Sequence, residues 1–218
     1  MNIIAIILVI CSSIEWNIKD STKRQYVLPN ELSTLISHTN LNPEGKPTEE
    51  VMTQAIENCV QSHPMVRHAE CYITTRGVVK VVLTQRVPLL GVKTEDKLYY
   101  IDEDRLRMPI HPRVNADELI WAKGKLDEAM AQTVLSDIVV WLKKHSYWEN
   151  RIAGIDVKNK QDIVLIDSSG LRVRIGDGTQ LENKMHKWRV FEEQMRKVEG
   201  KTYKELDLRY QDQVIGRE

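Results

Sequence analysis

The residue types that most often bind metals or carry catalysis are scattered through this sequence. The histidines are six in number, namely His38, His63, His68, His111, His145 and His186. No two of them have the i, i+4 spacing that places two imidazole rings on one helix face to bind a single zinc ion. His63 and His68 flank Pro64 and fall on different predicted elements. We therefore expect surface or turn positions for the histidines, and no metal site.

Motifs for nucleophilic catalysis or phosphate binding are absent from the sequence. It has no Gly-x-Ser-x-Gly elbow, no phosphate-binding glycine-rich loop and no dinucleotide fingerprint. Gly176-Asp177-Gly178 lies between a predicted strand and a predicted helix, where an anion can bind. A strand-to-helix turn needs such residues in any case, so we interpret this motif as a turn. Asp102-Glu103-Asp104 lacks the alternating ligands and the glycine of a calcium loop, and we interpret it as a solvated bend. These observations predict a protein that is not an enzyme and binds no cofactor.

The three cysteines also indicate structural roles. Cys11, Cys59 and Cys71 contain no Cys-x-x-Cys pair, and an odd number excludes a complete disulfide framework. Cys59 falls on a helical pattern and Cys71 on a strand pattern, so both are interpreted as small buried hydrophobic residues. A Cys59–Cys71 disulfide in an oxidising compartment is the less favoured alternative.

Charge and length exclude some classes of protein. The 218 residues suffice for one large or two small domains, and 31 basic residues balance 31 acidic ones. A nucleic-acid-binding protein usually has a basic excess or a basic stripe, and neither is present. The short clusters Lys143-Lys144 and Lys184 to Lys187 are interpreted as solvated helix faces.

The first residues predict a membrane anchor of which only the end is present. Ile3 to Ile10 is almost entirely apolar, but a spanning helix needs about 20 such residues. No basic residue precedes the run, which is untypical of a signal peptide. A lipoprotein signal ending at Cys11 is disfavoured because Ile10 is large. We assign residues 1–14 to a truncated anchor, with a buried core strand as the alternative.

The elements that follow indicate a small α+β unit. One helix is expected from Pro29, and a second from Thr48, which can cap it, to Pro64. The turn-rich stretch from Asn42 to Pro47 separates them. Patterns typical of strands cover Glu15 to Asp20, Val66 to Thr74 and Val78 to Arg86. The order strand, helix, helix, strand, strand predicts two helices packed on one face of a short sheet.

After Gly91 the patterns predict a second, mixed unit. Strong amphipathic helices are expected at Leu126 to Lys144 and at Leu181 to Val198, the second capped by Gly200. The predicted strands are Lys97 to Asp102, Leu106 to Met108, Glu118 to Ala122, Gly154 to Val157, Asp162 to Asp167, Leu171 to Ile175 and Tyr203 to Tyr210, the last followed by Val214-Ile215.

Two stretches resemble a known family. His63 to Ala69, followed by Gly77 to Pro88 with its closing Gln85-Arg86-Val87-Pro88, resembles the end of the polypeptide-transport-associated (POTRA) domain of FtsQ/DivIB proteins. Tyr99-Tyr100-Ile101-Asp102 with Met108-Pro109 resembles the hairpin that opens the next domain of that family, although Asp104-Arg105 replaces the usual glycine. Asn42 to Lys46 resembles the corresponding loop of Bacteroidetes-type members.

The second stretch lies at the end of the chain. Gly176 through Trp188, and then Tyr203 to Tyr210 with its Asp207-Leu208-Arg209-Tyr210, resembles the last helix and the closing strand of the family. The resemblance extends from about Cys11 to the last residue. It implies an anchor (1–14), a POTRA domain (15–90) and an FtsQ-type β domain (91–218).

The resemblance also implies a function. FtsQ-like proteins are single-pass inner-membrane proteins with most of the chain in the periplasm, at the division septum. They catalyse nothing and recruit FtsB- and FtsL-type partners, and through them FtsW and FtsI. A partner segment would add as a strand to an open sheet edge, here expected from Asp207 to Ile215. The implied partner-binding residues are Tyr203, Asp207, Arg209, Tyr210, Gln213, Val214 and Ile215.

Two other functions remain as alternatives. POTRA units also occur in outer-membrane assembly and secretion proteins, where they bind unfolded client polypeptides. Proteins of that class continue into a larger membrane domain, for which the residues after Gly91, with two strong helices, are a poor match. A secreted enzyme of another kind is the third alternative, which an activity screen on cell-wall substrates would test.

Overall fold

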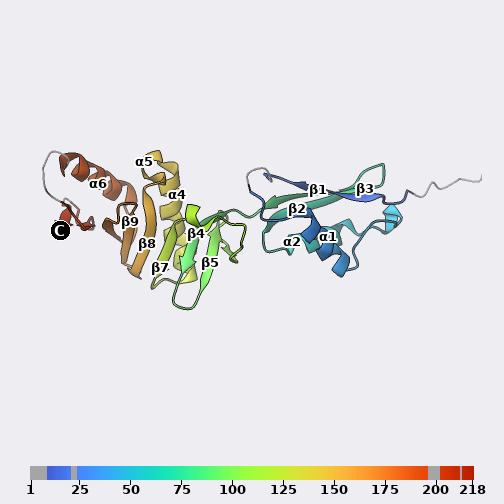
Figure 1. Ribbon diagram of the computed structural model, residues 1–218, viewed down its shortest axis with the longest axis horizontal. Helices are drawn as coiled ribbons and strands as arrows, with labels where there is room; N and C mark the ends of the chain where they lie inside the picture. The colour runs from blue at the N-terminus through green and yellow to red at the C-terminus, as the bar shows by residue number, and fades with distance from the viewer. Residues whose placement is uncertain (1–8, 21–23, 196–201, 212) are drawn as a thin grey trace, which may run out of the picture. The chain divides into compact units, whose positions relative to one another are not determined.

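The computed structural model describes residues 9–20, 24–195, 202–211 and 213–218. The chain divides into two compact units, one ending at Arg86 and the other beginning at Val87 (Figure 1). The predicted α+β fold class is confirmed, with a POTRA-like first unit followed by a mixed sheet with helices.

The first unit is a three-stranded sheet with two helices. Its elements are β1 (Ser13–Ile18), α1 (Pro29–His38), η1 (Thr48–Glu50), α2 (Thr53–Gln61), β2 (Val66–Ile73) and β3 (Val78–Gln85). The strand order is β1-β3-β2, with β1 parallel and β2 antiparallel to the central β3. Alternate residues of β3 are buried, because successive side chains of a strand point to opposite faces of the sheet.

The helices cover the buried face of this sheet. Leu32 and Ile36 of α1, with Ile56 and Val60 of α2, are at most 1% exposed. Val81 of β3 is fully buried as well. Burying each such side chain contributes roughly 1.5–3 kcal/mol.

A buried glutamine joins the end of β3 to the loop before α1. The side-chain oxygen of Gln85 accepts hydrogen bonds from the backbone N–H groups of Tyr26 (2.8 Å) and Val27 (2.9 Å). Its side-chain nitrogen donates to the carbonyl oxygen of Arg24 at 2.8 Å. Gln85 therefore forms hydrogen bonds to three backbone groups of the loop before α1.

The start of the described chain belongs to this unit. Cys11 is buried, and its backbone N–H donates to the carbonyl of Lys46 at 2.8 Å. Ser13 and Ile14, which were predicted to be part of the anchor, lie in β1. The rest of the apolar run, residues 1–8, lies outside the described residues. Within the described ranges no helix has the length and apolar character needed to cross a membrane.

Helix α1 begins at Pro29, as predicted, whereas the second helix begins later than predicted. Thr48 opens the short 3-10 turn η1, whereas α2 begins only at Thr53, so Thr48 does not cap it. At α1 the carboxylate of Glu31 reaches back to accept the backbone N–H of Leu28 at 3.0 Å. This contact satisfies one of the free N–H groups at the helix start.

The second unit is built on a nine-stranded mixed sheet. Its strands are β4 (Pro88–Lys93), β5 (Leu98–Asp102), β6 (Arg107–Met108), β7 (Trp121–Gly124), β8 (Ile152–Asn159), β9 (Asp162–Asp167), β10 (Arg172–Gly176), β11 (Glu205–Asp207) and β12 (Ile215–Arg217). The spatial order is β12-β11-β10-β9-β8-β7-β4-β5-β6. Strands β4, β7 and β8 run parallel to one another, as do β10 and β11.

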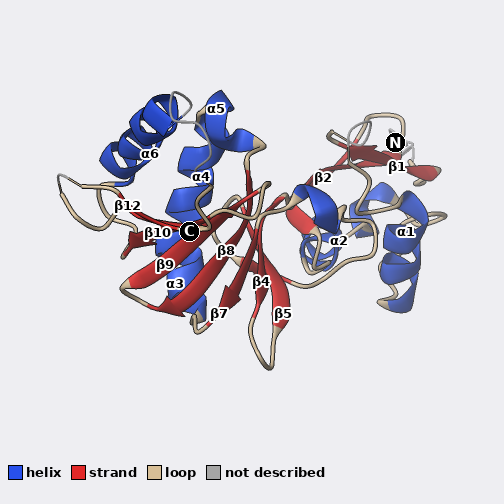
Figure 2. Cartoon of the chain, turned by 60° about the vertical axis from the view of Figure 1, so that its left-hand side comes forward, coloured by secondary structure: helices blue, strands red, loops and turns tan. Residues whose placement is uncertain are grey.

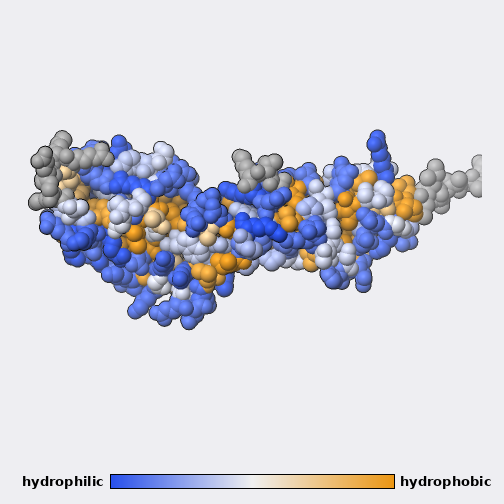
Figure 3. All heavy atoms as spheres, in the orientation of Figure 1, coloured by the Kyte–Doolittle hydropathy of each residue, from blue (hydrophilic) through white to orange (hydrophobic). Residues whose placement is uncertain are grey.

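The helices of this unit pack on one face of the sheet, as Figure 2 shows. They are α3 (Glu128–Met130), η3 (Ala131–Leu135), α4 (Ser136–Lys144), α5 (Ser146–Glu149) and α6 (Leu181–Met195). The short 3-10 turn η2 (Ala116–Glu118) instead contacts Trp121, whose indole N–H donates to the carbonyl of Ala116. Leu135 and Leu142, with Trp188 of α6, are fully buried against Leu165 and Val173 of the sheet. Hydrophilic residues cover most of the visible surface of the unit, and apolar residues show in patches between them (Figure 3).

The predicted helix from Leu126 to Lys144 is interrupted. Residues 131–135 form one turn of π-helix, in which the Ser136 hydroxyl donates to the carbonyl of Ala131 at 2.7 Å. Asp127 caps the start of α3 by accepting the backbone N–H of Met130 at 2.8 Å. The side chain of Arg105 donates to the carbonyls of Gln132 and Thr133, which joins the β5–β6 turn to this segment.

All three cysteines are free thiols. Cys11 is buried, whereas Cys59 and Cys71, which were predicted to be small buried hydrophobic residues, are only partly buried. Burial raises the pKa of Cys71 to about 11, and the nearby carboxylate of Glu57 adds to this effect. Cys71 is therefore protonated, and weakly nucleophilic, at neutral pH.

Candidate functional site

Strand β12 forms one margin of the second sheet. It is last in the spatial order and pairs antiparallel with β11, from Glu205 opposite Arg217 to Asp207 opposite Ile215. On its other side, β11 pairs with β10. The predicted open edge from Asp207 to Ile215 is therefore wrong for Asp207, because β12 covers that side of β11.

The predicted strand from Tyr203 to Tyr210 is also shorter than expected. Only Glu205–Asp207 is extended and paired, because the next carbonyl groups bind a helix side chain instead. The ammonium group of Lys187 in α6 donates hydrogen bonds to the carbonyls of Leu208, Tyr210 and Gln211 at 2.5–3.3 Å. These three bonds hold the connection from β11 toward β12 against α6.

The interpretation of Lys184 to Lys187 as a solvated helix face was therefore wrong. Lys184 is 8% exposed and donates to the carbonyl of Ile175 at 2.7 Å. Asp177 lies 3.7 Å from the same ammonium group. In the Gly176-Asp177-Gly178 turn both glycines have positive φ, and a Cβ on Gly178 would approach Val134 to 2.9 Å. This geometry agrees with a structural turn.

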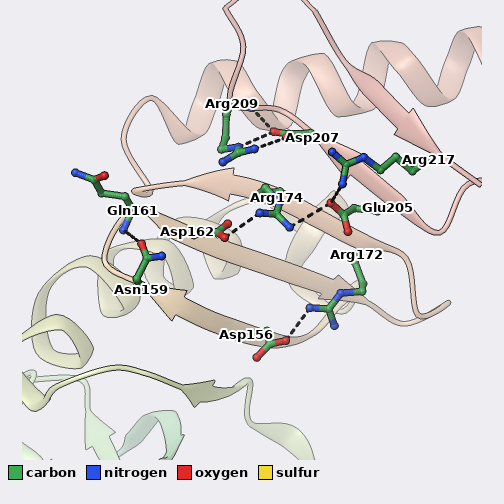
Figure 4. A network of polar contacts seen from close by, with 10 residues as sticks. All are labelled: Asp156, Asn159, Gln161, Asp162, Arg172, Arg174, Glu205, Asp207, Arg209 and Arg217. Carbon is green, nitrogen blue, oxygen red and sulfur yellow. Dashed lines mark hydrogen bonds and ion pairs between the residues drawn. The ribbon is translucent and has the colours of Figure 1, made fainter.

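Charged side chains form a ladder across the face of the sheet opposite the helices (Figure 4). Its ion pairs are Asp156–Arg172 (2.7 Å), Asp162–Arg174 (2.8 Å), Arg174–Glu205 (3.3 Å), Glu205–Arg217 (3.4 Å) and Asp207–Arg209 (2.7 Å). The ladder extends from β8 to β12. We call these side chains the charge ladder.

Asp207 is a buried member of the charge ladder, with 2% of its surface exposed. Its carboxylate accepts the backbone N–H of Arg209 (3.2 Å) and the side-chain Nε (2.9 Å) and Nη2 (2.7 Å) of the same residue. Burial is the largest single influence and raises the pKa of Asp207. The hydrogen bonds from Arg209 and the charges of Arg209 and Arg174 outweigh it, so the pKa lies below its ordinary value.

Arg209 itself has two contacts that fix its position. Its guanidinium binds the carboxylate of Asp207, and this contact raises the pKa of Arg209 above its ordinary value. Its aliphatic stem lies over Gly176, where a Cβ would come within 3.2 Å of Arg209 Cγ. The side chain is still 39% exposed. Arg209 therefore stabilises the fold directly, whether or not it also contacts a partner.

On the helix face, Tyr203 fills the space beside β12. A Cβ on Gly216 would lie 2.4 Å from Cδ1 of the Tyr203 ring, so glycine is required there. The ring also packs edge-on against Phe191 of α6, with the centroids 5.3 Å apart. Next to these residues, Val190, Gln213 and Val214 help to line a shallow groove of about 430 Å³ between α6 and the approach to β12.

The structure brings most of the predicted site residues together, but in different roles. Tyr203 and Asp207 are packed into the unit, and Val214 lies partly buried against its core. Tyr210, at 49% exposed, and Ile215, at 37%, present apolar surface to solvent, and Gln213 is exposed as well. Tyr210, Gln213 and Ile215 are therefore the predicted residues most accessible to a partner.

Sequence reasoning missed three residues that shape this edge. Lys187 positions the segment before β12, while Glu205 and Arg217 face each other across β11 and β12. The alternation of charge in Arg172-Val173-Arg174 and in Glu205-Leu206-Asp207 is a signal for a polar sheet face. It does not show which strands pair.

The chemistry of this site is suited to backbone recognition. Across the described residues, no group of three or more His, Cys, Asp or Glu side chains is placed to hold a metal ion. A strand at a sheet margin, by contrast, has backbone N–H and C=O groups that a further strand can bind.

Comparisons with known proteins connect both units to one family. A model of POTRA-like domains matches residues 9–84, and a model described as FtsQ/DivIB, C-terminal related, matches residues 87–217. No curated protein matches the sequence. Among solved structures, the major extracytoplasmic domain of the trans isomer of the bacterial cell division protein DivIB from Geobacillus stearothermophilus aligns with 10% identity and a TM-score of 0.37. That alignment covers 52% of this chain and 98% of the DivIB domain.

Proposed function

The chain belongs to the FtsQ/DivIB family of division proteins, and from this premise we propose that it is a non-enzymatic scaffold of the division septum. In this proposal the two units lie in the periplasm, and an anchor that includes the first residues holds them at the inner membrane. The scaffold recruits FtsB- and FtsL-type partners, and through them FtsW and FtsI, by accepting a partner strand on β12.

The observation that carries the proposal is the position of β12 at the sheet margin. The other margin is β6, which has two residues and is followed by Pro109 and, three residues later, Pro112. Proline has no backbone N–H and is a common means of blocking strand addition at a sheet edge. After Arg209, in contrast, the chain contains no proline. Of the two margins, β12 is thus the one that can accept a strand.

The surroundings of β12 supply the apolar contacts that added strands need. Ile215 lies in the strand, and Tyr210 lies in the segment held by Lys187. Tyrosine is among the residue types that contribute most to protein interfaces. The partner strand would gain main-chain hydrogen bonds from β12 and apolar contacts from these two residues.

Binding measurements on matched variants test this proposal. The full chain and its co-purified FtsB/FtsL-type partner are used, with the dissociation constant measured by biolayer interferometry. We expect Tyr210→Ala and Ile215→Lys each to weaken binding about tenfold or more, the effect of a typical interface hot spot. Thermal melts would verify that the variants are folded.

The control variants carry the same changes at equally exposed positions. Tyr72→Ala (48% exposed) changes the first unit and Ile110→Lys (41% exposed) changes the chain just after β6, at the other margin of the sheet, so both should leave the dissociation constant unchanged. Full-strength binding by folded Tyr210→Ala and Ile215→Lys proteins would contradict the proposal. In cells, we expect depletion of the protein to give filaments that lack septa.

A further inference from the structure

The charge ladder is in register across its last three strands. Arg172 of β10 lies opposite Glu205 of β11, and Glu205 lies opposite Arg217 of β12. The row therefore has alternating signs, positive, negative, positive, as it approaches the open margin. Side chains directly opposite each other on one sheet face interact, favourably when their charges are opposite and unfavourably when they are alike.

Arg217 is the ladder residue best placed to continue this alternation. Its side chain is 63% exposed, compared with 36% for Arg172 and 14% for Arg174. Its counter-ion, Glu205, is shared with Arg174 and lies on the inner side of β12. On the outer side, a strand added to β12 would place one residue opposite Arg217.

The neighbouring row ends differently. Arg174 lies opposite Asp207, and Asp207 lies opposite Ile215, which is apolar and exposed. Ile215 and Arg217 are two residues apart, so their side chains lie on the same face of the sheet. Gly216, between them, has no side chain, and Tyr203 occupies the space on the helix face.

We propose that β12 selects its partner strand by a side-chain pattern: an acidic residue opposite Arg217 and, two positions away, an apolar residue opposite Ile215. The inference rests on the proposed function, because it specifies which strand the edge accepts. The pattern reads acidic-x-apolar or its reverse, according to the direction of the added strand. On the opposite face, the residue across from Gly216 meets the ring of Tyr203, which favours an apolar or aromatic side chain there.

The test is a selection from displayed peptides against the immobilised full chain. The library has eight-residue extended peptides in which four central positions are randomised among Glu, Lys, Gln, Leu and Tyr. Contacts of the enriched peptides are located with a photo-crosslinker placed at Gln213, next to β12. For wild type we expect peptides crosslinked at this edge to carry Glu at the position opposite Arg217. They should bind roughly five- to tenfold tighter than the same peptides with Lys there.

Two variants make the outcome specific to Arg217. Arg217→Gln keeps a long polar side chain and should reduce the Glu-over-Lys preference to about one. Arg217→Glu should invert the preference, so that peptides with Lys bind more tightly than peptides with Glu. If Arg217→Glu fails to fold, the result for Arg217→Gln alone decides whether Arg217 sets the preference. The position opposite Ile215 is an internal control, at which Leu should be favoured over Glu. Raising the salt concentration should weaken the preference for Glu over Lys opposite Arg217, because salt screens charges. The preference for Leu over Glu opposite Ile215 should stay unchanged.

The possible failures are distinguishable. If peptides crosslink at β12 but show no preference for Glu, or if Arg217→Gln retains that preference, the charge pattern is overturned while strand addition stands. If no enriched peptide crosslinks at β12, the edge itself does not accept a strand, and both this inference and the proposed function are contradicted.

Discussion

The pair of Asp207 and Arg209 gives the sharpest test of how the end of the chain is held together. Arg209→Met keeps the aliphatic stem over Gly176 but removes the guanidinium from a carboxylate that is 2% exposed. Removing one partner of a buried ion pair typically costs 3–5 kcal/mol. Arg209 is 39% exposed, and Arg174 still interacts with Asp207, so we expect a smaller loss, about 2–4 kcal/mol.

The assay is urea unfolding of the full chain, followed by tryptophan fluorescence. Four of the five tryptophans lie in the second unit, and Trp16 in the first, so the signal reports mainly on the unit that contains the mutation. Arg189→Met is the matched control. Arg189 pairs with Glu193 one helical turn away and lies over the ring of Tyr147. Both side chains of the ion pair are more than half exposed, so the substitution should cost about 1 kcal/mol or less.

The dependence on pH gives a second readout. In wild type the pKa of Asp207 is lowered, so its contribution is present above the unfolded pKa of about 4 and is lost as the pH falls through the folded value. In Arg209→Met the burial remains without its main counter-ion, so the pKa of Asp207 should rise above that of the unfolded chain. The destabilisation should then shrink as the pH is lowered. A variant that loses no more stability than Arg189→Met, at any pH, would refute the buried-charge argument.

Two further predictions concern contacts that sequence patterns do not reveal. Gln85→Leu removes the acceptor of two backbone N–H groups and should destabilise the first unit by about 2–5 kcal/mol, whereas Thr84→Val, one residue earlier and partly exposed, should cost much less. Equal losses for the two variants in thermal melts would contradict the role given to Gln85. Lys187→Met should free the carbonyls of Leu208, Tyr210 and Gln211 and make this segment more sensitive to limited proteolysis. Unchanged cleavage there would show that Lys187 does not hold it.

The first unit could be predicted from the sequence because its patterns are local. The valine-rich run from Val78 to Gln85 identifies a strand, and the apolar stripe through Ile56 and Val60 identifies a helix that is buried on one side. The exact start of α2 could not be predicted, because Thr48 is a plausible cap by residue type and only the tertiary structure shows that it opens a separate turn.

Strand β4 shows where pattern analysis fails. Pro88 to Val92 is buried at every position, with Trp121 lying against Gly91, so the strand has no alternation to detect. Its proline occupies the first position, where a strand tolerates it, but a proline at this place in the sequence equally predicts the end of the preceding unit. The interrupted helix at 131–135 was likewise missed, because its apolar spacing is that of a continuous helix.

The strand at the end of the chain could be predicted only in part, and the reason is a different one. The apolar positions Leu206 and Leu208 fit one strand, but hydrogen bonding decides where it stops. The ammonium group of Lys187 donates hydrogen bonds to the carbonyls that follow β11, and the chain then turns back to form β12. Because the Lys187 contacts join residues more than twenty positions apart, no local pattern contains them.

Hydrogen–deuterium exchange on the full chain, with and without its FtsB/FtsL-type partner, tests strand addition most directly. If the partner's backbone pairs with β12, amides in residues 213–217 should exchange at least about tenfold more slowly in the complex, because they gain main-chain hydrogen bonds. The amides of β6 at the opposite margin should be unchanged. Unaltered exchange at 213–217 in a saturated complex would contradict the account.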